Sequence, residues 1–124
     1  MGTTVAKHYR ELIAWQKAMK LVKTVYELSK KFPKDEQFGL TNQLRRAVVS
    51  IPSNIAEGQG RGDGREFKHF LRIAHGSKQE VETQLIIARE LGYISQRDLD
   101  AVTTLSSELG RILTGLTKSL TTNN

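Results

Sequence analysis

Apolar side chains recur every three or four residues through four long stretches of this chain, and no stretch alternates as a β-strand does. This spacing matches the turn of an α-helix, about 3.6 residues, and places the apolar residues on one face. The predicted helices and the tails outside them are 9–31, 35–58, 64–92, 95–120, 1–7 and 121–124. Because short connections make consecutive helices antiparallel neighbours, we predict a single all-α domain, an up-down-up-down four-helix bundle spanning residues 1–124.

The first predicted helix has two apolar faces. We assign the core face to its larger side chains, namely Leu12, Trp15, Met19, Val22 and Tyr26. Phe32–Pro33 ends the helix, since the residue before proline avoids the α conformation. Three further residues, seven apart, lie outside that arc: Ala14, Leu21 and Leu28. A heptad stripe that the core does not need indicates a second packing surface.

The second predicted helix opens near Asp35, a residue type suited to an N-cap. Pro52 lies inside its apolar pattern and removes the hydrogen bond to the Val48 carbonyl, at a cost of roughly 3 kcal/mol. The apolar spacing nevertheless continues to Ile55, so we predict a helix kinked at Pro52 rather than a helix end.

A second apolar set lies on the back of this helix: Phe38, Val49 and Ala56. Two helices that both carry spare apolar stripes favour self-association. We therefore predict a homo-oligomer whose interface is formed by Ala14, Leu21, Leu28, Phe38, Val49 and Ala56.

Short polar side chains lie beside the apolar core face of the second predicted helix. We expect them to face Gly76 and Ser77, two small residues at the middle of the third predicted helix. If buried, each needs a hydrogen-bond partner, because an unpaired buried polar group costs about 1–3 kcal/mol. We predict a structural polar cluster of Ser50, Asn54, Glu57, Ser77 and Glu80. The alternative is the partly hydrated flank of an ordinary bundle helix.

The net charge of +6 belongs to the first half of the chain. Residues 1–61 hold 11 Lys and Arg against 5 Asp and Glu, whereas residues 62–124 hold 8 of each. Such an excess attracts nucleic-acid phosphates. The predicted contact residues are Lys17, Lys20, Lys23, Lys30, Lys31, Lys34, Arg45, Arg46, Arg61 and Arg65. The alternative is a solvated face that only keeps the protein soluble.

Catalytic patterns are weak. A two-metal bundle site needs two Glu-x-x-His units, and this chain has one, Glu66 to His69. The glycines of 58–64 fit neither the dinucleotide fingerprint nor the Walker A pattern. Glu57 and Glu80 suit a polar cluster better than an acid–base pair. We predict no enzymatic activity, no metal and no cofactor.

The cellular setting follows from what the sequence lacks. The chain has no cysteine, no apolar run near the ~18 residues of a membrane span, and no apolar core of a signal peptide near its start. We therefore expect a cytoplasmic protein that does not insert into a membrane.

Several motifs fall in the order typical of one family: AW, FP, GLTNQLRRA, SIPSNIAEG and FLRIAHGSKQE. Over about residues 9–120 the chain resembles the four-helix-bundle proteins encoded in intervening sequences of bacterial 23S ribosomal RNA genes. That family includes the accessory protein of diversity-generating retroelements. One departure is Lys78, where the family usually has an apolar residue.

The resemblance implies a pentameric barrel and, by analogy with the retroelement protein, a partner such as a reverse transcriptase together with nucleic acid. Most members have no established biochemical role. Two functions remain open. One is a non-enzymatic, oligomeric accessory protein that contacts RNA or DNA phosphates through its basic surface. The other is a protein-interaction scaffold, for example for a reverse transcriptase, without nucleic-acid binding of its own.

Overall fold

The computed structural model describes residues 8–122, which form four α-helices and two short 3₁₀ turns. The prediction of an all-α four-helix bundle is confirmed, and the described residues contain no strand. The elements in chain order are η1 (Tyr9–Glu11), α1 (Ile13–Ser29), η2 (Lys34–Glu36), α2 (Leu40–Gly60), α3 (Gly64–Glu90) and α4 (Gln96–Thr122). The predicted tail 1–7 lies outside the described residues.

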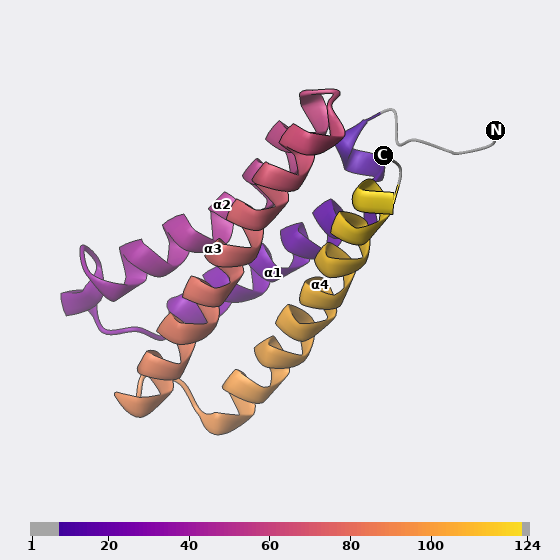
Figure 1. Ribbon diagram of the computed structural model, residues 1–124. Helices are drawn as coiled ribbons and strands as arrows, with labels where there is room; N and C mark the ends of the chain where they lie inside the picture. The colour runs from indigo at the N-terminus through magenta and orange to yellow at the C-terminus, as the bar shows by residue number, and fades with distance from the viewer. Residues whose placement is uncertain (1–7, 123–124) are drawn as a thin grey trace.

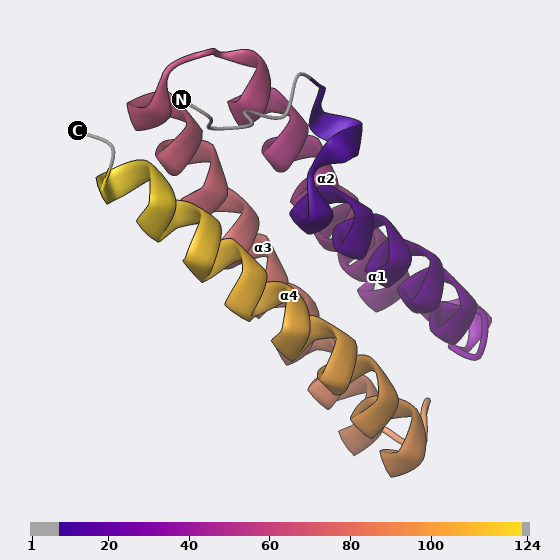
Figure 2. The same cartoon turned by 90° about the vertical axis from the view of Figure 1, so that its right-hand side faces the viewer.

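Each helix packs against two others, α1 and α3 both lying against α2 and α4. Figure 1 shows α3 running between α2 and α4, and Figure 2 shows the α1–α2 pair beside the α3–α4 pair. The chain reverses direction at each connection (Figures 1 and 2). This arrangement encloses one apolar core along the bundle axis and leaves the outer faces of all four helices open to ligands.

The core face of α1 is the stripe that the sequence analysis placed outside the core. Ala14, Leu21 and Leu28 are only 2%, 0% and 9% exposed, and Ala18 and Val25 lie buried between them. The residues assigned to the core, among them Trp15 and Val22, are only partly buried at its edge. The assignment was wrong because it favoured large side chains, whereas close helix packing selects a narrow heptad seam that tolerates alanines.

The first residues of α2 are held by a neighbouring carboxylate rather than by Asp35, which lies in the turn η2. Glu36 Oε1 accepts a hydrogen bond from the Leu40 amide at 2.9 Å, and the Tyr93 hydroxyl donates to Glu36 Oε2 at 2.8 Å. The first of these bonds does most to lower the pKa of Glu36, and the second raises the pKa of Tyr93. The start of α2 is thereby tied to the end of α3.

Pro52 is buried inside α2, which continues as one helix on both sides of it to Gly60. The helix therefore does not end at the proline, and the kink stays a prediction. Among the described residues, no helix combines the length and the apolar character that crossing a membrane requires.

Candidate functional site

The predicted polar cluster is smaller than expected. Ser50 and Ser77 share a hydrogen bond between their hydroxyl oxygens at 2.8 Å, which joins α2 to α3. Asn54 Nδ2 donates to the Ser50 hydroxyl at 2.9 Å and to the Ser50 carbonyl at 2.8 Å. The structure thus brings together Ser50, Asn54 and Ser77 through hydrogen bonds of their side chains. Their role in fixing helix packing stays a prediction.

Glu57 and Glu80 do not join this cluster. Both are exposed. Glu57 Oε2 pairs with Arg61 Nη2 at 2.9 Å, so it turns along its own helix instead of toward α3. Glu80 lies at the edge of a shallow hollow that Ser50, Ser77 and Arg46 also line. Exposure is the physical reason for the correction, because a solvated carboxylate gains little from a buried hydroxyl.

The predicted oligomer interface divides into two parts. Ala14, Leu21 and Leu28 lie in the core of the single chain and have no area to offer a second chain. Phe38 is 89% exposed and Val49 is 40% exposed. Val49 and Ala56 line a hollow of about 330 Å³ between α1 and α2, together with Trp15, Met19 and Val22 of α1. The surface open to a second copy is therefore this hollow and Phe38.

Four of the ten basic residues predicted to contact nucleic acid are already paired with carboxylates. Lys17 Nζ lies 3.1 Å from Glu108 and Lys31 Nζ lies 2.9 Å from Asp98, both across helices. Local pairs join Lys30 to Glu27 at 3.0 Å and Arg61 to Glu57 at 2.9 Å. Because these pairs are partly or fully exposed to solvent, they are weak and reduce the local positive charge without removing it.

Arg45 is occupied in a different way. Its Nε donates to the Ser29 hydroxyl at 2.8 Å, and its guanidinium lies 4.6 Å above the ring of Tyr26. Arg45 therefore joins α1 to α2 instead of pointing into solvent. The other five are exposed and form no ion pair within residues 8–122: Lys20, Lys23, Lys34, Arg46 and Arg65.

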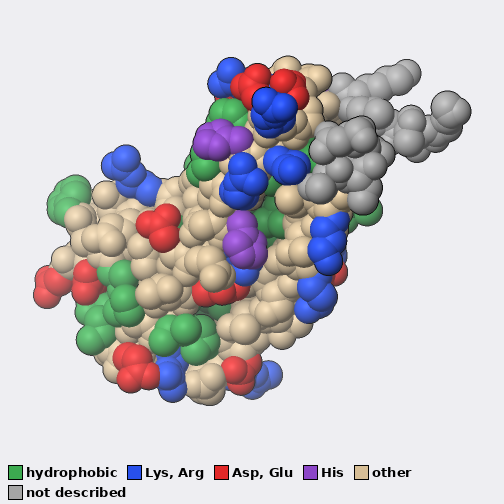
Figure 3. Space-filling view, viewed as in Figure 1, with side chains coloured by type: hydrophobic (Ala, Val, Ile, Leu, Met, Phe, Trp, Pro, Cys, Tyr) green, Lys and Arg blue, Asp and Glu red, His purple; other side chains and the backbone are tan. Residues whose placement is uncertain are grey.

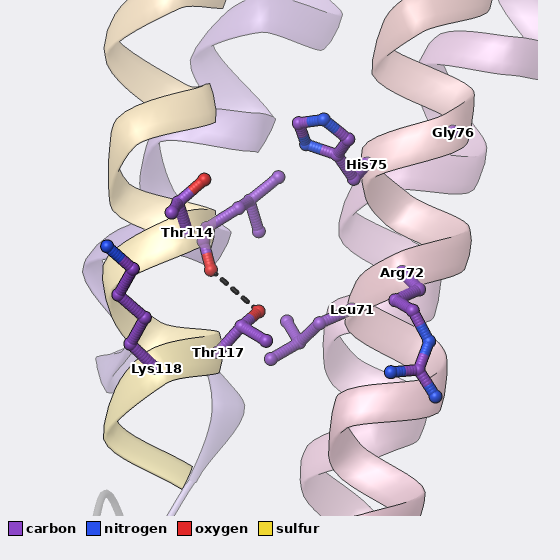
Figure 4. Close-up of a pocket in the computed structure, with 8 residues that line it drawn as sticks. Leu71, Arg72, His75, Gly76, Thr114, Thr117 and Lys118 are labelled. Atoms are coloured by element: carbon purple, nitrogen blue, oxygen red, sulfur yellow. Dashed lines mark hydrogen bonds between the residues drawn. The ribbon is translucent and has the colours of Figure 1, made fainter. Parts of the chain in front are cut away.

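A basic groove that the sequence analysis missed runs between α3 and α4. Two adjoining hollows, of about 430 and 480 Å³, share His75, Thr114 and Lys118. Arg72 lines the first hollow and Arg111 lines the second. Figure 4 shows His75 pointing from α3 toward α4, with Arg72 and Lys118 on opposite helices. Figure 3 shows Lys, Arg and His side chains gathered over the upper part of this face.

The groove is open because its walls contain glycine. A Cβ added at Gly76 of α3 or at Gly115 of α4 would meet no other atom within 4 Å. The floor is apolar, formed by Leu71 and Leu113, each only 1% exposed. Small residues at the rim and leucines below thus leave a channel that side chains do not fill.

The positive charge of this groove comes from two stretches without acidic residues. Residues 67–79 and 109–122 together contain five Lys and Arg, two His and no Asp or Glu. Two acidic residues beside these stretches pair with cations outside them, Glu66 with Arg61 at 3.8 Å and Glu108 with Lys17 at 3.1 Å. Of the other two, Glu82 pairs with Lys78 at 2.8 Å, and Glu80 lines a different hollow. The net charge of residues 62–124 is zero, so counting charges over the whole half gave no sign of this groove. Counting charges in windows of about 13 residues would have shown the two stretches without acidic residues.

Lys78 lies beneath the groove. It is only 5% exposed, and its Nζ lies 2.8 Å from Glu82 Oε2, which also accepts a hydrogen bond from the Ser106 hydroxyl of α4. Burial acts to raise the pKa of Glu82, but the bonds from Lys78 and Ser106 and the nearby positive charge outweigh it and hold that pKa below its ordinary value. The Lys78 stem passes Gly110, where a Cβ would lie 3.1 Å from its Cε.

Among residues 8–122, no three His, Asp or Glu side chains come together as a candidate metal site, so Glu66 and His69 are not joined there by a third ligand. The lysine and arginine side chains of the groove can instead bind anions.

The comparisons with known proteins agree with this fold. The family described as 23S rRNA-intervening sequence protein matches residues 10–115. A crystal structure of a protein of unknown function from the S23 ribosomal protein family of Bacteroides thetaiotaomicron superposes with a TM-score of 0.78. The two sequences are 22% identical, and the match covers 86% of this chain and 99% of the other. A comparison with curated proteins gives no match.

Proposed function

Because the chain belongs to the family of 23S rRNA-intervening sequence proteins, whose function is unknown, we propose its role from its own surface: a non-enzymatic accessory protein that binds the phosphates of RNA or DNA. The observation that carries this proposal is the excess of exposed cations without carboxylate partners. Four of these cations lie in the first half of the chain, namely Lys20, Lys23, Lys34 and Arg46, and two more, Arg72 and Arg111, line the groove between α3 and α4.

Binding through phosphates makes affinity depend on salt. Each neutralised phosphate releases counterions, so log affinity falls against log salt with a slope of about −0.7 to −0.9 per contact. We expect fluorescence anisotropy with labelled RNA or DNA to show tight binding at ~50 mM salt and a loss of orders of magnitude at ~200 mM, as several contacts require. Absence of binding at the lower concentration would reject the proposed function.

Sequence preference is the control for this experiment. The described residues that line the groove include no tyrosine, tryptophan or phenylalanine, so the basic surface offers phosphate contacts rather than readout of base edges. Oligonucleotides of equal length and different sequence are expected to bind with similar affinity. A large preference for one sequence would mean that contacts to bases, and not charge, carry the binding.

The second candidate function, a protein-interaction scaffold, is favoured by a separate observation. Large apolar side chains are exposed at one end of α3 and before α2: Phe38, Ile86, Ile87 and Leu91. Exposed apolar groups of this size mark surfaces where another protein packs. Such a scaffold, for example for a reverse transcriptase, would use these residues and would not bind nucleic acid by itself.

We also propose that the protein self-associates, with a pentamer as the expected ring size from the family resemblance. The hollow lined by Trp15, Met19, Val22, Val49 and Ala56 is apolar and open, and Val49 lies at its edge. Light scattering at micromolar concentration is expected to give a mass of several chains. Val49→Asp is expected to lower that mass, because a carboxylate in an apolar interface costs several kcal/mol.

Asn42→Asp provides a control, since Asn42 is exposed on the same helix and does not line that hollow. A mass near one chain for the unaltered protein would reject self-association. A trimer or tetramer would contradict only the ring size.

A further inference from the structure

We infer that the groove between α3 and α4 is the site that holds nucleic acid, and that it accepts a single strand in preference to a duplex. This inference rests on the proposed function and narrows it to one surface and one form of the ligand. The sequence analysis had placed the contacts on the first half of the chain. The geometry points instead to the second half.

Basic side chains line both sides of the groove. On α3, Arg72 and His75 are three residues apart and share one face of the helix. On α4, Arg111 and Lys118 are seven residues apart and share another. A strand lying along the groove would therefore have positive charge on both sides.

On the first half of the chain, part of the positive charge is already engaged within the protein. There, Lys17, Lys30 and Lys31 each face a carboxylate, and Arg45 lies against Tyr26. Within residues 8–122, Arg72 and Arg111 form no ion pair. Free guanidinium groups suit phosphate because they present two parallel N–H donors.

The floor of the groove suits the rest of a nucleotide. Leu71 and Leu113 form an apolar surface, and His75 presents an aromatic ring at the place where the two hollows meet. Unpaired bases stack on imidazole rings and on guanidinium planes, whereas bases in a duplex are already stacked on each other. Apolar floor and cationic rims together match a flexible single strand.

The test compares two charge-neutralised variants of the full chain. Arg72→Gln/Arg111→Gln removes two cations from the groove. Lys20→Gln/Lys23→Gln removes two exposed cations from α1 and serves as the matched control. Binding is measured by anisotropy with labelled single strands of about 10 nucleotides, within the ~4–16 nucleotides of a typical single-strand site, and with the corresponding duplex.

We expect the groove variant to bind the single strand more weakly. The slope of log affinity against log salt is expected to become shallower by about 1.4, because two phosphate contacts of about 0.7 each are lost. The control variant is expected to change the slope by less than half that amount. The unaltered protein is expected to bind the single strand more tightly than the duplex. RNA and DNA strands are tested separately, since both present the same phosphates.

Three outcomes distinguish the claims. Equal losses in the two variants, or an unchanged slope in the groove variant, would overturn the groove as the site while leaving nucleic-acid binding intact. Tighter binding of the duplex would overturn the single-strand preference. Absence of binding by the unaltered protein at ~50 mM salt would overturn the proposed function as well. Circular dichroism of each variant confirms that exposed substitutions leave the helices intact.

Discussion

Replacing Gly58 by alanine is expected to lower the free energy of unfolding by about 2 kcal/mol. Gly58 is buried in α2 where that helix meets α3. A Cβ there would lie 2.7 Å from the Cβ of Phe70 and 2.9 Å from Cδ1 of Phe67. The Phe70 atom is attached to the backbone and has no rotamer to escape into, so the two helices must move apart.

Two opposing effects decide the size of that loss. Overpacking a core typically costs about 1–3 kcal/mol. We place the clash with the Phe70 Cβ at the upper end, about 3 kcal/mol, because that atom cannot move without its backbone. Alanine is the better helix former by about 1 kcal/mol, which offsets part of the cost. The balance leaves a net loss of about 2 kcal/mol.

Gly76→Ala is the control for this prediction. It makes the same chemical change in the interior of α3, where an added Cβ would meet nothing within 4 Å. Without a clash, only the helix preference remains, and we expect stability to rise by about 0.5–1 kcal/mol. Urea unfolding at one protein concentration measures both variants. A Gly58→Ala protein as stable as Gly76→Ala would show that α2 and α3 do not approach as closely as described.

Lys78→Met is expected to lower the free energy of unfolding at pH 7 by about 2 kcal/mol. Methionine fills the volume of the lysine stem but leaves Glu82 without its cation, 2.8 Å away. Breaking a fully buried ion pair costs about 3–5 kcal/mol. The Glu82 side chain is 30% exposed, so water compensates part of that cost.

Acid titration identifies the origin of this effect. The pKa of Glu82 in the folded protein lies below its ordinary value of 4.5, so the stabilisation is present above pH 4.5 and is lost as the pH falls through the folded-state pKa. In Lys78→Met the hydrogen bond and the charge of Lys78 are lost while burial remains, so the pKa of Glu82 rises above its value in the unaltered protein. The difference in stability between the two proteins is therefore expected to be full at pH 7 and to vanish once Glu82 is protonated in both.

A second substitution separates charge from packing. Lys78→Met/Glu82→Gln is expected to regain most of the lost stability, because a neutral amide needs no cation and still accepts the hydrogen bond from Ser106. If the double variant is as unstable as Lys78→Met, the loss comes from the shape of the methionine side chain. A stability difference that does not change with pH would lead to the same conclusion.

Local features were readable directly from the sequence. The spacing of apolar residues predicted four helices and the bundle, and in α2 the residues at this spacing, Leu44, Val48, Ile51 and Ile55, are all fully buried. The cap of α4 is equally local: Asp98 N donates to Ser95 Oγ at 3.0 Å and Ser95 N donates to Asp98 Oδ2 at 3.2 Å. These features depend on residues three or four positions apart, so they can be recognised in the sequence itself.

The tertiary structure decided what depends on residues far apart in the chain. Two apolar arcs of α1 were both eligible for the core, and only the approach of α2 and α4 selects Ala14, Leu21 and Leu28. Lys31 acquires Asp98 as a partner across 67 positions, which no count of charges along the chain reveals. The groove likewise exists only because an acid-free half of α3 lies beside an acid-free half of α4. The physical reason is common to all three. Burial and charge pairing depend on which helix faces meet, and the periodicity within one helix does not say which other helix packs against it.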